Sequence, residues 1–230
     1  MPNFISEHQI EQALVHKLQH RHGFDVLNCH TVNAKDLNDG SNRARKRDVI
    51  LVDRVRDVAL RLNPDIPPEA IESALEKLCE QRQAMSLIAA NQEIYGLLCD
   101  GIPVTFDNAQ GRSQQGRVRL LDFNVPSNNR YLVVTQLWIK GRRGFCRPDV
   151  LLYVNGIPLV LIALKNSTVA LRNAYDDNLT NFKAEIPQLF LTNAFCVLSN
   201  AIETKVGSIT AQWQHYFNWL RVDDEKQQID

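Results

Sequence analysis

Two runs of apolar residues, Val150–Val154 and Leu159–Leu164, flank an Asn-Gly dipeptide at positions 155–156. Asn-Gly between alternating apolar residues is typical of a β-hairpin, because both residues tolerate a positive φ. A charged residue lies at the open end of each run, Asp149 before the first and Lys165 after the second. Since the open ends of two hairpin strands lie side by side, the pattern predicts a functional site there.

The register of this hairpin decides which side chains accompany Asp149. A two-residue turn places Asp149 opposite Ile162, whereas a three-residue loop places it opposite Ala163. Pro158 cannot donate a hydrogen bond to the strand pairing and is best tolerated as the first residue of a strand. We therefore expect the three-residue loop, accompanied by a β-bulge. In that register Asp149, Ala163 and Lys165 share one face, because side chains alternate between faces along a strand.

The N-terminal part of the chain predicts an amphipathic helix over Ile5–Gln19, where apolar residues recur at helical spacing. Ser6 is a suitable N-cap, and Gly23 is a suitable stop. Glu11 lies beside the apolar stripe and is either a solvated helix charge or part of a site. A strand is expected next, over Phe24–Val32.

The segment from about 43 to 100 is expected to be helical. It opens on the basic stretch Arg43–Arg47, which is either a solvated helix start or a patch that contacts DNA phosphates. A helix follows and ends before Pro64, and two more are expected over Ala70–Gln83 and Ser86–Leu98.

Two strands over Pro103–Asp107 and Gly116–Asp122 are expected to pair as a hairpin and to lead into a strand over Tyr131–Lys140. Gln136 lies within that strand, where alternation would bring it to the side of Val134. A buried Gln in a sheet is either a satisfied structural polar group or part of a site.

After the hairpin at 149–165, the pattern predicts a helix over Thr168–Glu185 and a strand over Leu189–Leu198. This crossover indicates an α/β fold with a mixed sheet and helices on both faces. The length of 230 residues fits one domain. We place that domain at residues 1–225, with a helical insertion at about 43–100 and a polar tail or linker start at 226–230.

Composition limits the possible functions. The 26 Lys and Arg residues balance the 26 Asp and Glu residues, so any DNA contact must come from a local patch. No apolar run approaches about 18 residues, so no membrane span is expected, and the N-terminus lacks the features of a signal peptide. Five scattered cysteines without a CxxC pair suit a reducing compartment, so we expect a cytoplasmic protein.

The sequence from Arg147 to Lys165 carries a recognisable motif. Pro148-Asp149, a hairpin and Ala163-Leu164-Lys165 together resemble the PD-(D/E)xK nuclease motif. The longer string RPDVLLYVNGIPLVLIALK resembles the N-terminal endonuclease domain of the R (restriction) subunit of type I restriction-modification enzymes. The resemblance covers most of residues 131–200 and, more weakly, the first helix. In that family the second strand ends in Glu-Leu-Lys, so Ala163 replaces the usual acid.

The resemblance implies a restriction-endonuclease-like fold, a mixed sheet flanked by helices with an inserted helical lobe. It implies a Mg²⁺ site held by Asp149, by an acidic residue at position 163 and by the backbone carbonyl of Leu164. Lys165 would orient the attacking water or stabilise the phosphate. Glu11, with Glu7 as the alternative, and Gln136 match supporting positions.

Other residues are assigned less directly. The family helix after the hairpin carries Gln-x-x-x-Tyr, and the matching positions here are Asn178 and Phe182. The basic loop at 140–143 leads directly into Asp149, so contacts to DNA phosphates are expected from Arg142, Arg143, Arg147 and Lys183.

Ala163 changes the expected activity. A methyl group cannot bind a metal, and removing one electrostatic contributor of this kind costs about 10²–10³ in rate, with more for a lost ligand. We therefore expect this chain to cleave DNA poorly or not at all. Either a deliberate Glu-to-Ala replacement or natural decay of the site explains the alanine.

The resemblance implies a Mg²⁺-dependent endonuclease without base specificity, because a separate specificity subunit reads the target in this family. The implied partners are double-stranded DNA and the modification and specificity subunits, with no membrane. Family members continue into an ATP-driven translocase, so the chain is expected to be a fragment and ATP to act only through the missing part.

Two alternatives remain. One is a non-catalytic DNA-binding or assembly module on a degenerate nuclease fold. The other is a stand-alone structure-specific nuclease such as a junction resolvase, which a dimeric state in solution would favour.

Overall fold

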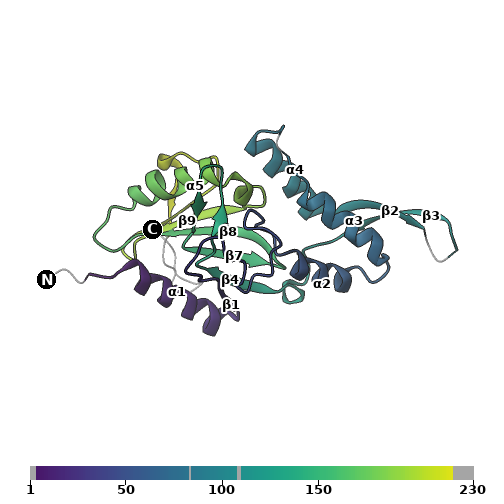
Figure 1. Cartoon of the computed structure of the whole chain (residues 1–230), viewed down its shortest axis with the longest axis horizontal. Coiled ribbons are helices and arrows are strands. Elements are labelled where there is room, and N and C mark those ends of the chain that lie inside the picture. Colours follow the sequence, from purple (N-terminus) through teal and green to yellow (C-terminus); the bar gives the residue numbers. More distant parts are fainter. Residues whose placement is uncertain (1–3, 83, 108–109, 220–230) are drawn as a thin grey trace, which may run out of the picture.

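The computed structural model of the protein describes residues 4–82, 84–107 and 110–219. Its centre is a seven-stranded sheet (Figure 1), in which two neighbouring pairs are parallel and the others antiparallel. The predicted mixed α/β architecture is therefore confirmed. In spatial order the strands are β1 (Asp25–Asn28), β4 (Tyr131–Thr135), β7 (Val150–Val154), β8 (Ile157–Leu164), β9 (Phe195–Ser199), β10 (Thr204–Gly207) and β11 (Phe217–Asn218).

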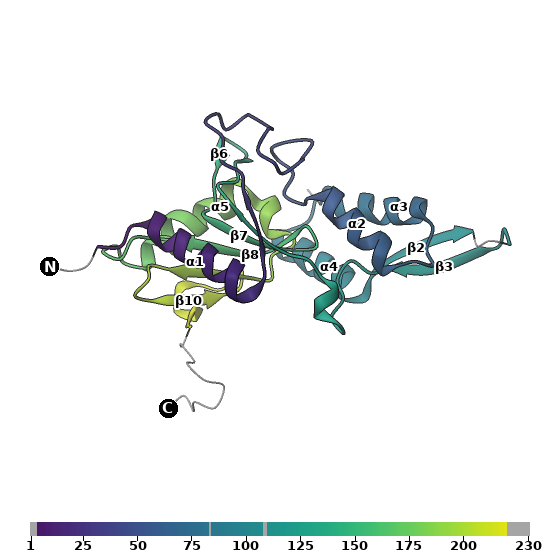
Figure 2. The ribbon, with the colours of Figure 1, turned by 90° about the horizontal axis from the view of Figure 1, so that it is seen from below.

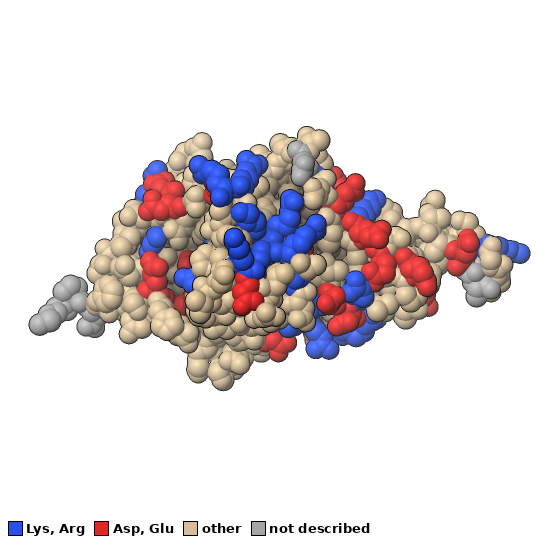
Figure 3. Space-filling model, in the orientation of Figure 1, with Lys and Arg blue, Asp and Glu red and all other residues tan. Residues whose placement is uncertain are grey.

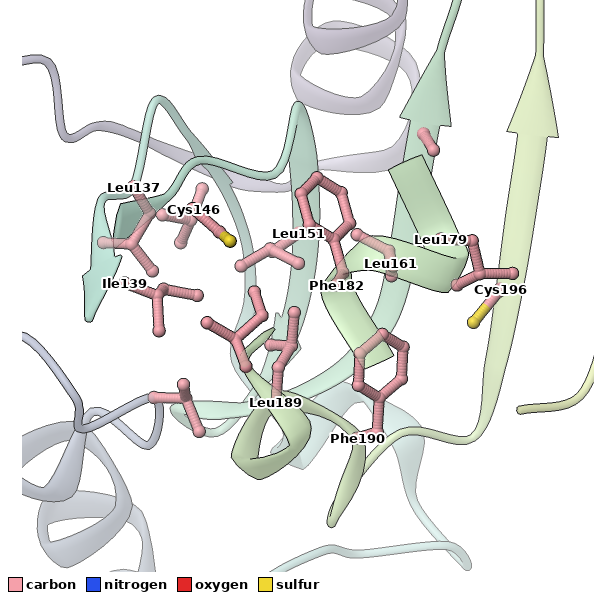
Figure 4. Close-up of a cluster of buried hydrophobic side chains, with 14 of the residues drawn as sticks. Leu137, Ile139, Cys146, Leu151, Leu161, Leu179, Phe182, Leu189, Phe190 and Cys196 are labelled. Atoms are coloured by element: carbon pink, nitrogen blue, oxygen red, sulfur yellow. The ribbon is translucent and has the colours of Figure 1, made fainter. Parts of the chain in front are cut away.

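Helices cover both faces of this sheet (Figures 1 and 2). Helix α1 (Glu7–His22) packs Ile10 and Leu14 against the face that carries Val150 and Ile162. A larger cluster fills the other face beneath the helical segment that follows β8 (Figure 4); its members include Leu137, Ile139, Leu151, Leu161, Leu179, Phe182, Leu189 and Phe190. None of the helices in the described part of the chain is long and apolar enough to cross a bilayer.

The ends of α1 follow from local sequence. The Ser6 hydroxyl accepts a hydrogen bond from the Gln9 N–H, and the Gln9 side chain accepts one from the Ser6 N–H, which is a capping box. Gly23 ends the helix with φ +70°, in the left-handed region. The predicted helix, its cap and its stop are confirmed.

A second group of elements extends to one side of the sheet (Figure 1) and has its own apolar core around Val55, Ile71 and Ile94. The predicted hairpin is present as a separate two-stranded sheet. The elements are α2 (Val52–Leu62), α3 (Pro68–Cys79), α4 (Leu87–Asp100), β2 (Ile102–Asp107) and β3 (Ser113–Val118). The assignment of one domain at 1–225 with an insertion stays a prediction, and the tail at 226–230 lies outside the described residues.

The turn between β7 and β8 corrects the expected three-residue loop. Val154 pairs with Ile157, so the turn has two residues, Asn155 and Gly156, both with positive φ. Asn155 is held by tertiary contacts: its side chain donates to the Leu120 carbonyl at 2.8 Å and accepts from the Arg130 N–H at 2.7 Å. Those contacts outweigh the preference of a proline for the start of a strand.

A β-bulge is nevertheless present, as expected, but farther from the turn. The pairing shifts between Leu152 and Tyr153, after which Val150 lies opposite Ile162. Continuing that register brings Asp149 level with Ala163. The expected neighbourhood of Asp149 therefore forms by a different combination of turn and bulge.

The segment after β8 is less regular than the predicted helix. A π-helical turn, η2 (Ala174–Leu179), precedes α5 (Thr180–Glu185), and the 3-10 turn η3 (Pro187–Phe190) delays the next strand to Phe195. In the π-helical turn, the Thr180 hydroxyl donates to the Tyr175 carbonyl five residues earlier, at 3.0 Å. The predicted crossover between parallel strands is confirmed, because β8 and β9 are parallel neighbours.

Candidate active site

Asp149 lies half-buried immediately before β7, at the open end of the hairpin. Its Oδ2 accepts a hydrogen bond from the Leu164 N–H at 2.8 Å, which ties it to the end of β8. Burial raises the pKa of Asp149 to about 6, and the negative charges of Glu7 and Glu11 contribute to this rise. The Leu164 N–H and the Lys165 charge act in the opposite direction. The negative charge of Asp149 is therefore only partly offset by the Leu164 N–H and the Lys165 charge.

Glu11 approaches this site from α1. Its side chain accepts a hydrogen bond from Gln136 Nε2, at 3.1 Å to Oε2 and 3.4 Å to Oε1. Burial raises the pKa of Glu11, while the Gln136 hydrogen bond and the charges of His8 and Arg147 lower it. The predicted helix charge is 8% exposed, so the solvated interpretation does not hold.

Gln136 reaches Glu11 because the chain leaves the strand. β4 ends at Thr135, and Gln136 has φ +58°, so the expected continuous strand over 131–140 is wrong. A positive φ is uncommon for a residue other than glycine and is found where tertiary contacts impose it. The later residues of the expected strand instead form β5 (Ile139–Lys140), which pairs with β6 (Phe145–Cys146).

Lys165 and Ala163 complete the open end. Lys165 directly follows β8, its N–H donates to the Ser199 carbonyl at 2.9 Å, and its charge lowers the pKa of Asp149. Ala163 has no exposed surface and belongs to the apolar cluster of that face. At the position where the nuclease motif expects an acid, the chain thus buries a methyl group.

The oxygen atoms around Asp149 are of the kind that binds a hard cation, but they are too few to form a complete metal site. Asp149, Glu11 and the Leu164 carbonyl offer oxygen ligands, which Mg²⁺ prefers. Both carboxylates have a raised pKa, the direction expected for buried acids that a cation would stabilise. Within residues 4–82, 84–107 and 110–219, however, no three His, Cys, Asp or Glu side chains are grouped closely enough to hold a metal ion. An acid at position 163 would supply the missing ligand.

Comparison with known proteins identifies the relatives of this chain. Residues 4–215 match the family described as "Type I restriction enzyme R protein N terminus (HSDR_N)". The chain belongs to this family. The restriction-endonuclease-like fold expected for its members accords with the seven-stranded mixed sheet.

Two curated relatives illustrate the match. The "Type I restriction enzyme HindI endonuclease subunit" of Haemophilus influenzae is 33% identical over 230 residues, which cover 96% of this chain and 21% of that protein. The "Putative type I restriction enzyme MjaIXP endonuclease subunit" of Methanocaldococcus jannaschii is 29% identical over 192 residues, 80% of this chain and 18% of the relative. The chain spans about a fifth of the length of these proteins.

The basic residues expected to contact DNA in this type I family member differ in their surroundings. Arg147 is exposed and stacks on the ring of Trp138, 5.0 Å from its centroid, close enough to Glu11 to lower its pKa. Arg142 is also exposed. Arg143, by contrast, is bound to Glu185, with its N–H 3.0 Å from Oε2.

Two further predicted residues lie on the helical segment after β8. Lys183 is half-buried with Nζ 5.8 Å from the Tyr175 ring centroid, and burial lowers its pKa. Asn178 is half-buried in η2, and within the described residues it makes no hydrogen bond to Asp149, Glu11 or Lys165. These two residues are not brought into the hydrogen-bonded cluster around Asp149.

Sequence reasoning missed the role of the stretch Arg43–Arg47. Arg43 and Lys46 are buried and bind Asp39, with Nη2 and Nζ at 2.8 and 2.7 Å from Oδ2. Arg43 Nη2 also donates to the Trp138 carbonyl at 3.1 Å. Two of its cations therefore fasten a loop beside the site and are unavailable to DNA. Asp39 and Glu185 are 4 to 42 residues from the cations that they bind, and no motif marks either acid.

Proposed function

We propose that this chain is the Mg²⁺-dependent DNA endonuclease domain of a type I restriction-modification R subunit, and that Ala163 impairs its cleavage. The observation that supports this most directly is the position of Asp149 at the open end of β7 and β8, where its carboxylate accepts a hydrogen bond from the Leu164 N–H and the charges of Glu11 and Lys165 act on its pKa. In this proposal the arrangement corresponds to the PD-(D/E)xK motif with its second acid replaced by Ala163.

In this proposal Asp149, the Leu164 carbonyl and Glu11 hold the metal ion. Bound Mg²⁺ would offset the charge of the scissile phosphate and lower the pKa of a bound water. The Leu164 N–H fixes one oxygen of Asp149 at 2.8 Å and leaves the other free to act as a ligand. Gln136 fixes Glu11 in the same way. Lys165 supplies a positive charge that orients the attacking water and stabilises the negative charge developing on the phosphate.

The experiment restores the missing acid. Ala163→Glu should nick supercoiled plasmid in Mg²⁺ at least about 10²-fold faster than the unchanged chain, the size of effect expected for one electrostatic contributor. Asp149→Asn in the Ala163→Glu background should remove this activity, and EDTA should abolish it. A folded Ala163→Glu protein with no gain over the parent would contradict the proposal.

Partners follow from the same proposal. The substrate is double-stranded DNA without base specificity, and the modification and specificity subunits of the complex supply target recognition. ATP would act through the translocase that follows in longer relatives. Such a complex would work in the cytoplasm, where its DNA substrate is found.

A second candidate is a non-catalytic DNA-binding or assembly module. The burial of the Ala163 methyl group in an apolar cluster favours it. It predicts that Ala163→Glu gains no nuclease activity while DNA binding in the absence of metal is retained.

A further inference from the structure

Two adjoining cavities lie outside the cluster around Asp149. Their volumes are about 460 and 650 Å³, and both are lined by Arg47, Gln188 and Leu191. Arg54 lines the first cavity, and Lys140 and Arg142 line the second. We call this continuous feature the basic groove. Five exposed cations line it: Arg45, which is paired with Asp48, and Arg47, Arg54, Lys140 and Arg142, which form no ion pair within the described residues.

Hydrogen bonds fix the two loops that carry three of these cations. The Lys140 N–H donates to the Lys46 carbonyl at 2.9 Å. Gln188 Nε2 donates to the Lys140 carbonyl at 3.0 Å and to the Arg47 carbonyl at 3.4 Å. The Arg142 N–H donates to the Glu185 carbonyl at 2.9 Å. The cations therefore project from a fixed backbone and not from independent surface loops.

Acids also line the groove, with Asp48, Asp53 and Glu80 in the first cavity and Glu185 in the second. The charge of Arg142 contributes to lowering the pKa of Glu185, after the hydrogen bonds from Arg143. In the described part of the chain, no carboxylate lies within ion-pair distance of Arg47, Arg54, Lys140 or Arg142. Other arginines along the groove are paired, as Arg56 is with Glu72. Figure 3 shows Lys and Arg side chains gathered near the centre of this face, with Asp and Glu side chains gathered over α2 and α3. A protein without net charge thus presents a local positive field.

We propose that the basic groove holds the phosphate backbone of duplex DNA on its way to Asp149; this rests on the proposed nuclease function. The cations follow a groove shared by two cavities and do not converge on one point, which suits a chain of phosphates better than a single small anion. The β5–β6 hairpin carries Lys140 and Arg142 at the groove, and Arg147 and Asp149 follow it directly. One short segment therefore connects the groove to the site.

The residues that contact DNA in this proposal differ from those expected from the sequence. Arg47 and Lys140 enter the set, whereas Arg143 is occupied by Glu185 and Lys183 is half-buried. Arginine suits this role because its guanidinium can donate two hydrogen bonds to one phosphate.

The test is DNA binding by the whole chain in EDTA, with a fluorescent duplex of about 30 base pairs. Replacement of Arg47, Lys140 and Arg142 together by Gln should weaken binding at least tenfold. It should also reduce the slope of log K against log salt by about 2–3, since each phosphate contact contributes about 0.9. Because single replacements each remove one contact, Arg142→Gln and Arg47→Gln should each lower the slope by about 1, which preserves the test if the triple variant unfolds.

The matched control removes three other exposed cations. Replacement of Lys17, Lys35 and Lys77 by Gln gives the same net charge but leaves the groove intact. The control should retain most of the affinity and the slope. Equal loss in both triple variants, or an unchanged slope in the groove variants, would overturn the proposal. Displacement of DNA by polyglutamate at equal charge concentration would also overturn it, in favour of an acidic protein partner.

The outcome can be separated from that of the nuclease proposal, because binding is measured without metal and without cleavage. If Ala163→Glu nicks DNA but the groove variants bind normally, the groove assignment fails and the nuclease proposal stands. If Ala163→Glu does not nick DNA but the groove variants lose binding, the groove stands and the second candidate function gains support.

Discussion

Two aspartates in this molecule, the buried Asp39 and the half-buried Asp149, have opposite surroundings. Asp39 accepts hydrogen bonds from Lys46, Ser41 and Arg43, and although burial opposes them, they lower its pKa to about 2. Asp149 has one backbone donor, and burial raises its pKa to about 6. The negative charge of Asp39 is balanced by the positive charges of Arg43 and Lys46, whereas the negative charge of Asp149 is only partly balanced by its neighbours.

The difference separates a structural acid from a functional one. The loop around Asp39 gains stability from its ionised form, and it holds the backbone next to Trp138. At the end of the hairpin, the ionised Asp149 destabilises the folded state, because it is half-buried and is repelled by the charge of Glu11. The charge of Lys165 offsets only part of this effect. Strongly perturbed acids of the second kind are typical of functional sites.

The largest expected effect is at Asp39. Asp39→Ala leaves Arg43 and Lys46 buried without a counter-charge, which should lower the free energy of unfolding by about 3–5 kcal/mol. Urea unfolding would measure this, with the exposed Asp65→Ala as control. The stabilisation by Asp39 should be complete above about pH 4 and be lost as the pH falls towards 2. If Asp39→Ala lowered the free energy of unfolding no more than Asp65→Ala, Asp39 would lack the structural role that distinguishes it from Asp149.

Asp149→Asn should change the free energy of unfolding in the opposite direction. At pH 7.5 the ionised Asp149 is unfavourable in the folded state, so its removal should raise the free energy of unfolding by about 1–3 kcal/mol. The raised pKa means that this gain is absent below about pH 4, grows between about pH 4 and 6, and is constant at higher pH. Urea unfolding at several pH values, with the exposed Asp177→Asn as control, would measure the gain. A pH-independent or destabilising effect would show that Asp149 is structural.

Gln136→Ala should give the smallest effect. It removes the hydrogen bond to Glu11 and should cost about 1 kcal/mol of stability. It should also raise the pKa of Glu11 further, because that hydrogen bond lowers it. An NMR titration of the Glu11 carboxyl group would detect the shift. An unchanged titration would mean that Gln136 does not orient Glu11.

Elements governed by neighbouring residues were predictable from the sequence. The capping box at Ser6 and the stop at Gly23 define α1, and the Asn-Gly dipeptide defines the hairpin. The neighbourhood of Asp149 was anticipated, but from a three-residue loop, whereas a two-residue turn and a bulge between Leu152 and Tyr153 produce it.

Features fixed by distant contacts were not predictable. Arg43 binds a carbonyl 95 residues away, and with Lys46 it becomes a structural cation within a stretch that was a candidate DNA patch. Gln136 adopts a positive φ to reach an acid 125 residues earlier in the chain. The Asn155 side chain holds a two-residue turn through contacts about 25 to 35 residues away. Local propensity carries no information about such partners.

The most direct test of the account is Mg²⁺-dependent stability of Ala163→Glu, followed by calorimetric melting. In EDTA the variant should be less stable than the parent by about 3 kcal/mol, because a third carboxylate is buried beside Asp149 and Glu11. Mg²⁺ at about 100 times its Kd should recover about 2.7 kcal/mol, with little response from the parent or from Asp149→Asn in the same background. A variant that melts identically with Mg²⁺ and EDTA would contradict a cation site at the open end of the hairpin.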